Sequence, residues 1–129
     1  MLEVLRKTIT IETSEGNYNL VFCPAVPKGY KALNEVISKH IKLQNMARAI
    51  SKEDNLAGAV RWIADQAELA EEYIRAIEKA VDYDSFMEVA DILEHISVES
   101  LSYITVALVT AYNDFYKSEL EKLDKELEP

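Results

Sequence analysis

Residues 56–81 read LAGAVRWIADQAELAEEYIRAIEKAV, and this stretch decides how the rest of the chain is expected to fold. Apolar residues recur in it at alternating steps of four and three, which predicts one continuous stripe along an α-helix. The stripe consists of Leu56, Val60, Ile63, Ala67, Ala70, Ile74, Ile77 and Val81. A second apolar stripe beside it consists of Trp62, Leu69, Tyr73, Ala76 and Ala80. With more than one face to cover, this segment is predicted to be the central helix of a bundle.

The composition is that of one globular domain spanning residues 1–129. The chain is 49% apolar and 29% charged, and its length is sufficient to bury a core without a disulfide or a metal. Its single cysteine, Cys23, excludes an internal disulfide and, with no signal-peptide pattern, favours a cytoplasmic location. The longest apolar run, residues 103–112, is far shorter than the ~20 residues of a membrane-spanning helix, so no membrane association is expected.

The net charge of −9 is unevenly distributed along the chain. Residues 28–52 sum to +5, whereas residues 53–129 sum to −13. This division favours pairing between elements, either within a subunit or between neighbouring subunits. Nucleic acid is not expected as a ligand, because phosphate contacts need a broad basic face and most of this chain would repel them.

Local patterns predict an α+β fold that is mostly α, a bundle of about four helices with an N-terminal β-hairpin. Residues 1–23 form the hairpin, with alternating strands at 8–13 and 18–22 around a four-residue loop. Pro24, Pro27 and Gly29 are expected to prevent a helix before Tyr30. Ser51 is the expected cap of the central helix, and Ser85 with Glu88 resembles a capping box. The helices are therefore predicted at residues 30–50, 52–81, 85–96 and 98–127.

Three side chains are candidates for chemistry, and each also has a structural interpretation, which we favour. His40 lies in an apolar stripe. It is either a ligand or general base, or a buried histidine that is satisfied by one hydrogen bond. His95 follows Asp91 by four residues, which places both on one face of a helix. The two either hold a metal or a proton relay, or they form only an exposed intrahelical pair. Cys23 has no activating motif around it and is interpreted as a packed residue rather than a nucleophile. We expect no catalytic residue, no metal site and no cofactor.

The C-terminal residues 117–128 are almost all charged, apart from three leucines on one side of the predicted helix. Leu120, Leu123 and Leu127 continue an apolar stripe beyond the length that the shorter preceding helix can cover. They either offer a narrow apolar seam to another helix, or they cap the end of the same core or simply fray. The sequence leaves these two alternatives open.

The order of the elements carries a resemblance to a known family. A hairpin at residues 8–22 and a Pro/Gly joint precede a helix beginning YKALNEV at residues 30–36. The helical remainder contains YIRAIEKAV at 73–81, FMEVADIL at 86–93 and SLSYITVAL at 100–108. This arrangement, over most of the chain, resembles the tail assembly chaperones of long-tailed bacteriophages.

The resemblance implies a non-catalytic protein of the host cytoplasm that binds the long, helical tape measure protein. Such chaperones keep the tape measure protein soluble and help to recruit tail tube subunits. The residues expected to bind the partner are Met46, Ile50, Leu120, Leu123 and Leu127. The opposed charges of residues 28–52 and 53–129 predict a homo-oligomer stacked head to tail, with Lys39 and Lys42 at the contact.

A different class of interaction protein is the alternative. An antitoxin, an immunity protein or a phage-encoded inhibitor would use the acidic face of this chain to block a basic site on one compact partner. The size of the partner separates the two interpretations.

Overall fold

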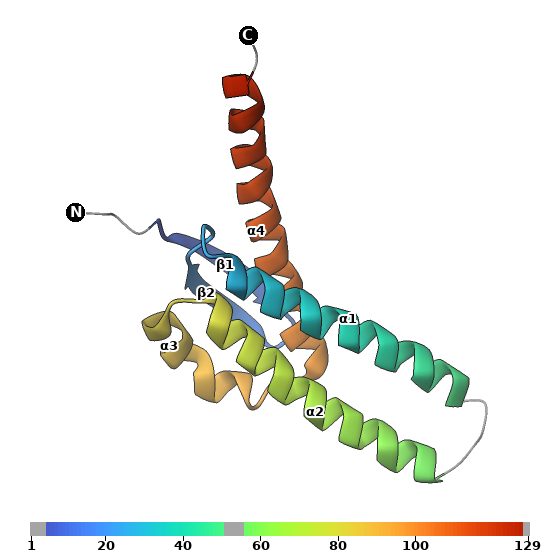
Figure 1. Cartoon of the computed structure of the whole chain (residues 1–129). Coiled ribbons are helices and arrows are strands. Elements are labelled where there is room, and N and C mark those ends of the chain that lie inside the picture. The colour runs from blue at the N-terminus through green and yellow to red at the C-terminus, as the bar shows by residue number, and fades with distance from the viewer. Residues whose placement is uncertain (1–4, 51–55, 128–129) are drawn as a thin grey trace.

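A computed structural model describes residues 5–50 and 56–127, and it places a β-hairpin against four helices (Figure 1). The strands are β1 (Lys7–Thr13) and β2 (Gly16–Phe22). The helices are α1 (Pro27–Ile50), α2 (Leu56–Ala80), α3 (Tyr83–Leu93) and α4 (Val98–Leu127). For residues 47–50, 56, 57 and 127 only the backbone is described. The predicted fold class, mostly α with an N-terminal hairpin, is confirmed.

The hairpin closes through a shorter turn than the predicted four-residue loop. β1 and β2 pair antiparallel over all seven residues of each strand, so that Thr13 pairs with Gly16. Only Ser14 and Glu15 remain in the turn. Thr13 Oγ1 donates a hydrogen bond of 2.9 Å to the Gly16 carbonyl, and Gly16 adopts a φ of 140°. Because a Cβ makes that φ unfavourable, the glycine is what permits the second strand to start so early.

The outer edge of β2 is covered by the start of α3. The Val21 N–H donates to Ser85 Oγ at 3.0 Å, and the Val21 carbonyl accepts a bond of 2.7 Å from the Asp82 N–H. α3 begins at Tyr83, so the predicted capping box of Ser85 and Glu88 is wrong. The Ser85 hydroxyl accepts a hydrogen bond from the N–H of a strand residue instead of from an N–H at the start of its own helix.

α1 begins at Pro27, and the prediction that no helix forms before Tyr30 is wrong. Proline is tolerated in the first turn of a helix, where its missing N–H would have no intrahelical partner in any case. Gly29 is needed for close approach, since a Cβ there would lie 2.8 Å from Ala80 Cα and 2.8 Å from Tyr112 Oη. The first turn of α1 therefore packs directly against the end of α2 and against α4.

The remaining helix bounds differ less from the predictions. α4 matches its predicted range of 98–127, while α3 ends at Leu93, three residues before the predicted end at residue 96. α2 ends at Ala80, because Val81 leaves the helix to form a bridge with Phe22 of β2. The predicted start of this helix at residue 52 and its predicted cap, Ser51, lie outside the described residues.

One hydrophobic core joins the inner face of the hairpin to all four helices. α2 contacts α1, α3 and α4, as predicted for a central helix. The largest fully buried side chains come from both layers: Phe22, Leu20, Leu33, Leu69, Tyr73, Ile77, Leu93, Leu101, Ile104, Leu108 and Tyr112. Aromatic rings of β2, α1 and α4 meet where Phe22, Tyr30 and Tyr116 surround Tyr112.

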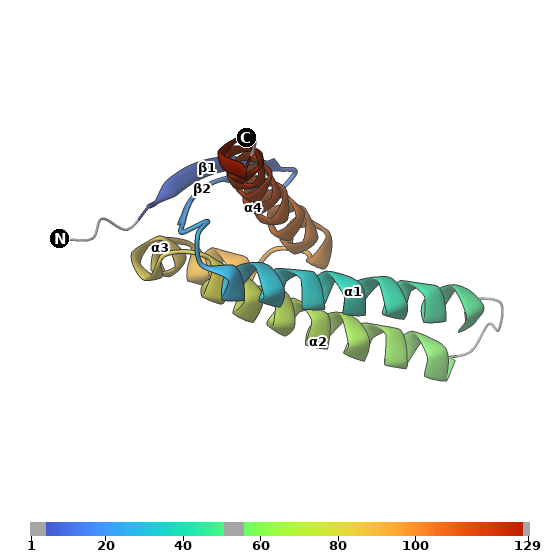
Figure 2. The same ribbon diagram turned by 45° about the horizontal axis from the view of Figure 1, so that its top comes forward.

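Two parts of the helices extend beyond this core in different directions (Figures 1 and 2). α1 and α2 lie side by side, and their far halves project together as a hairpin arm, which we define as residues 41–50 and 56–67. The second half of α4 projects separately, and we define the α4 arm as residues 117–127. Both arms are candidates for contact with a partner.

Candidate protein-binding surfaces

The stripe that marks α2 in the sequence is covered only at its C-terminal end. Ile77 and Val81 are buried, but Val60 and Ile63 are 61% and 63% exposed, and Ala67 is exposed as well. The core side of α2 is supplied by the second stripe, namely Leu69, Tyr73, Ala76 and Ala80. α3, which contacts α2, has 11 residues where α2 has 25, so it is less than half as long.

Larger apolar side chains are also exposed on the hairpin arm. Trp62 belongs to the second stripe, yet it is exposed because it lies on the arm, beyond the core. Ile41 and Met46 of α1 are exposed on the same arm. Met46 is therefore accessible, as its predicted role requires, whereas the side chain of Ile50 lies outside the described residues.

The α4 arm carries the predicted leucine seam. Leu120 is 61% exposed and Leu123 is 49% exposed, and the helix continues through both without a break. The side chain of Leu127 lies outside the described residues. Leu120 and Leu123 therefore do not cap the core, while the binding of another helix to the exposed seam stays a prediction.

The predicted partner-binding residues do not form one continuous surface. Met46 lies on the hairpin arm and Leu120 and Leu123 lie on the α4 arm, and the two arms point away from each other in both views (Figures 1 and 2). The sequence could not show this separation, because the angle between the arms depends on how α4 crosses the core. A partner that contacts both sets must span the two arms.

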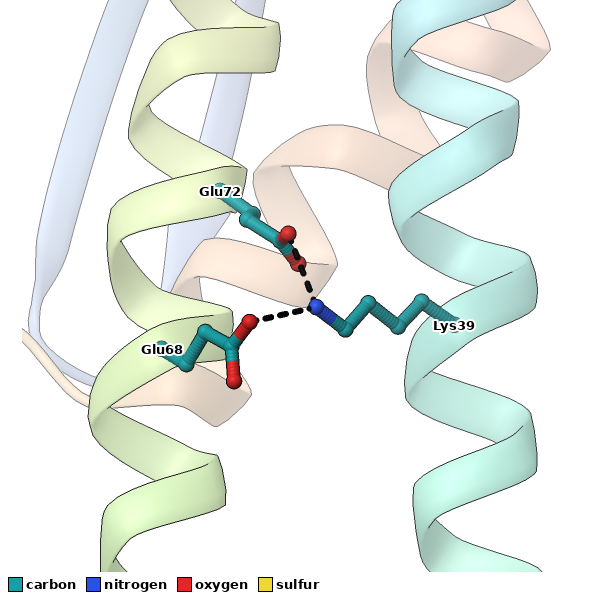
Figure 3. Close-up of polar contacts among 3 residues, drawn as sticks. All are labelled: Lys39, Glu68 and Glu72. Atoms are coloured by element: carbon teal, nitrogen blue, oxygen red, sulfur yellow. Dashed lines mark hydrogen bonds and ion pairs between the residues drawn. The ribbon is translucent and has the colours of Figure 1, made fainter.

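Lys39 binds two carboxylates within its own chain. Its Nζ lies 2.8 Å from Glu68 Oε1 and 2.8 Å from Glu72 Oε1, so the ammonium sits between α1 and α2 (Figure 3). The hydrogen bond that Lys39 donates to Glu68, followed by the one that it donates to Glu72, raises the pKa of Lys39 above its usual value. This ion pair joins the basic segment to the acidic segment inside one subunit, which is one of the two pairings that the charge division predicted.

Lys42 lies one turn further along α1, where it is exposed and forms no ion pair among the described residues. Its charge is therefore available to another molecule, in contrast to that of Lys39. The prediction that both lysines hold stacked subunits together stays a prediction. The intrachain ion pair gives Lys39 a second role that any test of stacking must take into account.

His40 is a partly buried histidine with a hydrogen bond between its Nδ1 and the hydroxyl of Tyr73. Burial lowers the pKa of His40 and raises the pKa of Tyr73 to about 12. Tyr73 thus stays neutral beside a neutral imidazole, and the two rings lie edge-on with their centroids 5.5 Å apart. The pair links α1 to α2, in agreement with the structural interpretation of this histidine.

The other two candidate side chains have structural surroundings among the described residues. His95 is exposed, and its Nδ1 donates to the Asp91 carbonyl at 2.7 Å rather than to the Asp91 carboxylate. Cys23 is partly buried where β2 ends. Within residues 5–50 and 56–127, no three His, Cys, Asp or Glu side chains gather as a metal ion would need.

Glu15 makes a structural contact with the start of α4 that the sequence did not reveal. From the β-turn, its carboxylate accepts hydrogen bonds from the Ser97 N–H at 3.1 Å, from the Ser97 hydroxyl and from the Ser100 hydroxyl at 2.6 Å. Ser97 Oγ also accepts from the Ser100 N–H, which is the usual N-cap bond. The three hydroxyl and amide donors lower the pKa of Glu15. Because 82 residues separate Glu15 from Ser97, no local pattern indicates the contact.

Comparison of this chain with protein-family models, with curated proteins and with solved structures gives no match. Among the described helices, none combines the length and the apolar character that crossing a membrane requires. The two arms, with their exposed apolar side chains, are therefore the candidate functional surfaces.

Proposed function

We propose that this protein is a non-catalytic tail assembly chaperone of a long-tailed bacteriophage, which binds helical segments of the tape measure protein and helps to recruit tail tube subunits. One observation carries the proposal: two helical arms extend beyond the core, and each bears an exposed apolar stripe. Stripes with this spacing are what an amphipathic helix packs against. A long client with many such helices could be held at several points by several copies.

The hairpin arm offers the surface that is best suited to a helix. Val60, Ile63 and Ala67 follow one another at steps of three and four, and all three are exposed. Ala59 and Ala64, which flank them, are exposed too and carry only a methyl group. Short flanking side chains allow a second helix to approach closely, so the larger Val60 and Ile63 side chains can insert between its residues.

The acidic charge of the chain supports a holding function. A protein that exposes apolar stripes, and that binds a client exposing more of them, needs charge to remain dispersed. Residues 53–129, which include one side of the hairpin arm and the whole α4 arm, supply a net charge of −13. Apolar contact with the client and electrostatic repulsion between complexes therefore come from the same segment.

The proposal is tested by coexpression with the tape measure protein of the same genetic element. The soluble yield of the tape measure protein should rise with the wild-type chain and should fall several-fold with Ile63→Glu and with Leu123→Glu, because a carboxylate in either stripe must be desolvated on binding. The matched control is Ser118→Glu. Ser118 is exposed on the α4 arm, but its position two residues before Leu120 puts it on another side of the helix.

Affinity purification from cells that carry the native genetic element identifies the partner independently. Recovery of a very long helical protein, with tail tube subunits, is the expected result. Recovery of one compact basic enzyme or toxin, bound equally well by the Ile63→Glu and Leu123→Glu variants, would reject the chaperone. It would instead support an inhibitor that acts through its acidic face.

A further inference from the structure

The outer edge of β1 is open, whereas the outer edge of β2 is covered by α3. Both backbone groups of Val21 bind α3 and its N-cap, so they point away from β1. Val21 pairs with Thr8, and the polar groups of Thr8 therefore point away from β2. The alternation of a strand gives Thr10 and Glu12 the same orientation. Among the described residues, none of these three outward N–H and C=O pairs has a hydrogen-bond partner.

The same three residues are exposed, and their side chains lie on the face of β1 opposite to Ile9 and Ile11, whereas α4 contacts β1 as part of the core. Proline is absent from β1, and no described helix hydrogen-bonds to its outer edge. Three unpaired N–H and C=O pairs along a regular seven-residue strand are a template for another strand.

We infer that β1 pairs antiparallel with β1 of a second copy of this chain, across a twofold axis that passes beside Thr10. The two hairpins then form one four-stranded sheet. This inference is independent of the proposed function, since it concerns a part of the molecule that neither arm includes. The occupant is a second copy because the strand is complementary to itself in this register.

In the proposed register, two residues of the paired β1 strands face each other when their numbers add up to twenty. The strand is complementary to itself in this register. Thr10 then faces its own equivalent, Ile9 faces Ile11, and Thr8 faces Glu12. All seven residues of β1 are paired, and the outward groups of Thr8, Thr10 and Glu12 all gain partners. The two β-branched Ile9 and Ile11 pairs lie on the core side, where Ile11 is already buried.

The charges of the edge agree with the same register. Lys7 faces Thr13 and Glu12 faces Thr8, so no residue opposes a like charge. Glu12 lies diagonally across from Arg6 of the second copy, a distance that long side chains bridge. Arg6 is half exposed and contacts Asp82 through its Nε alone, so other guanidinium nitrogens are free to reach Glu12.

The first experiment measures the dimer dissociation constant by sedimentation for three chains. Wild type should reach twice the 14.6 kDa chain mass. Thr8→Glu places a carboxylate opposite Glu12 of the second copy at two symmetric positions, and we expect the dissociation constant to rise about tenfold. Thr8→Lys at the same exposed position places an opposite charge there, and we expect the constant to fall about threefold. Thr8 is exposed, so both variants should keep the wild-type circular dichroism spectrum.

The second experiment removes an outward hydrogen bond. Thr10→Pro deletes an N–H that points away from β2, so it should abolish the dimer and leave the β1–β2 ladder intact. Its matched control is Thr10→Val, because both variants lose the 2.7 Å bond between Thr10 Oγ1 and Asn19 Oδ1 but only the valine keeps the N–H. The valine variant should remain dimeric.

Three results would overturn the inference. One is a wild-type chain that stays monomeric at all concentrations, and another is equal dimerisation of the Thr8→Glu and Thr8→Lys variants. The third is a dimer that Ile63→Glu abolishes while Thr8→Glu leaves it unchanged, which would place the contact on the hairpin arm.

Discussion

Glu15 is the residue through which the β-turn stabilises the start of α4. Its carboxylate accepts hydrogen bonds from Ser97 and Ser100 at the N-terminal end of the helix, where a negative charge is also favoured by the helix dipole. The contact fixes the hairpin over the α4 end that belongs to the core.

The lowered pKa of Glu15 predicts the pH range in which this contact stabilises the protein. The hydrogen bonds from Ser100 and Ser97 bring the pKa below the ordinary value of 4.5, so the folded state binds this proton less readily than the unfolded state. The stabilisation is complete above that ordinary value and is lost as the pH falls through the lower folded value. Glu15→Gln should unfold at a lower temperature than wild type at neutral pH, and the difference in melting temperature should shrink as the solution becomes acidic. A difference that is constant with pH would contradict this assignment.

At the scale of elements, one cation between two carboxylates adds an ion pair to the apolar contact between α1 and α2. Lys39 contacts Glu68 and Glu72, and Glu72 Oε2 is buried without a hydrogen-bond partner among the described residues. We expect Lys39→Ala to lower the melting temperature, because Glu72 then loses its cation, whereas Lys42→Ala at a position without an ion pair should leave it unchanged. Thermal melts at low and high salt measure this, since screening should reduce the effect. Equal melting temperatures for the two variants would show that the ion pair does not hold the helices together.

The same comparison separates the intrachain role of Lys39 from the predicted stacking of subunits. Lys39→Glu would disturb the α1–α2 contact whether or not subunits stack. Lys42→Glu changes only an exposed charge, so it is the variant that tests stacking. A change in oligomer size with Lys42→Glu at unchanged melting temperature is the result that stacking predicts.

At the scale of the whole molecule, the first half of α4 belongs to the core and its second half projects as the α4 arm. Leu108 is fully buried in the core, while Leu123 is half exposed on the α4 arm. Leu108→Ala should reduce the free energy of unfolding by about 2–5 kcal/mol, and Leu123→Ala by less than about 0.5 kcal/mol. Chemical denaturation measures both values. A large effect of Leu123→Ala would mean that the arm is part of the core, which would remove the seam from the proposed function.

The two arms are the features of the whole molecule on which the proposed function rests. Helices that end where the core ends need no exposed stripe, yet α2 and α4 both continue past it with apolar spacing intact. Val60 and Ile63 on one arm and Leu120 on the other are each more than half exposed. The proposed function assigns these side chains to contact with a partner.

Much of the fold follows from short-range patterns. The alternation in residues 8–22 predicts the hairpin, and local patterns predict the bounds of α4 at residues 98 and 127. The bounds of α1 and α3 were less predictable, because contacts distant in sequence decide them. Gly29 fits only against Ala80 and Tyr112, and the Ser85 hydroxyl binds Val21 rather than its own helix.

The candidate surfaces show the same division. The sequence marks Leu120 and Leu123 as a candidate seam, because charged residues surround them, but only the structure shows that both are exposed. It does not identify Val60 and Ile63, because an apolar stripe looks the same whether a neighbouring helix or a partner covers it. The tertiary structure decides that question, because it leaves Val60 and Ile63 beyond the part of α2 that packs in the core.

By itself the sequence determined the class of the fold, the helical stripes and the division between basic and acidic segments, because each depends on residue types at fixed spacing. Only the tertiary structure decided which stripe is buried, that Lys39 is neutralised within the chain, and that β1 keeps an open edge. These features depend on which elements meet in space and on where each one ends. Hydrogen bonds and burial between residues far apart in the chain set those endpoints, and no local spacing encodes them.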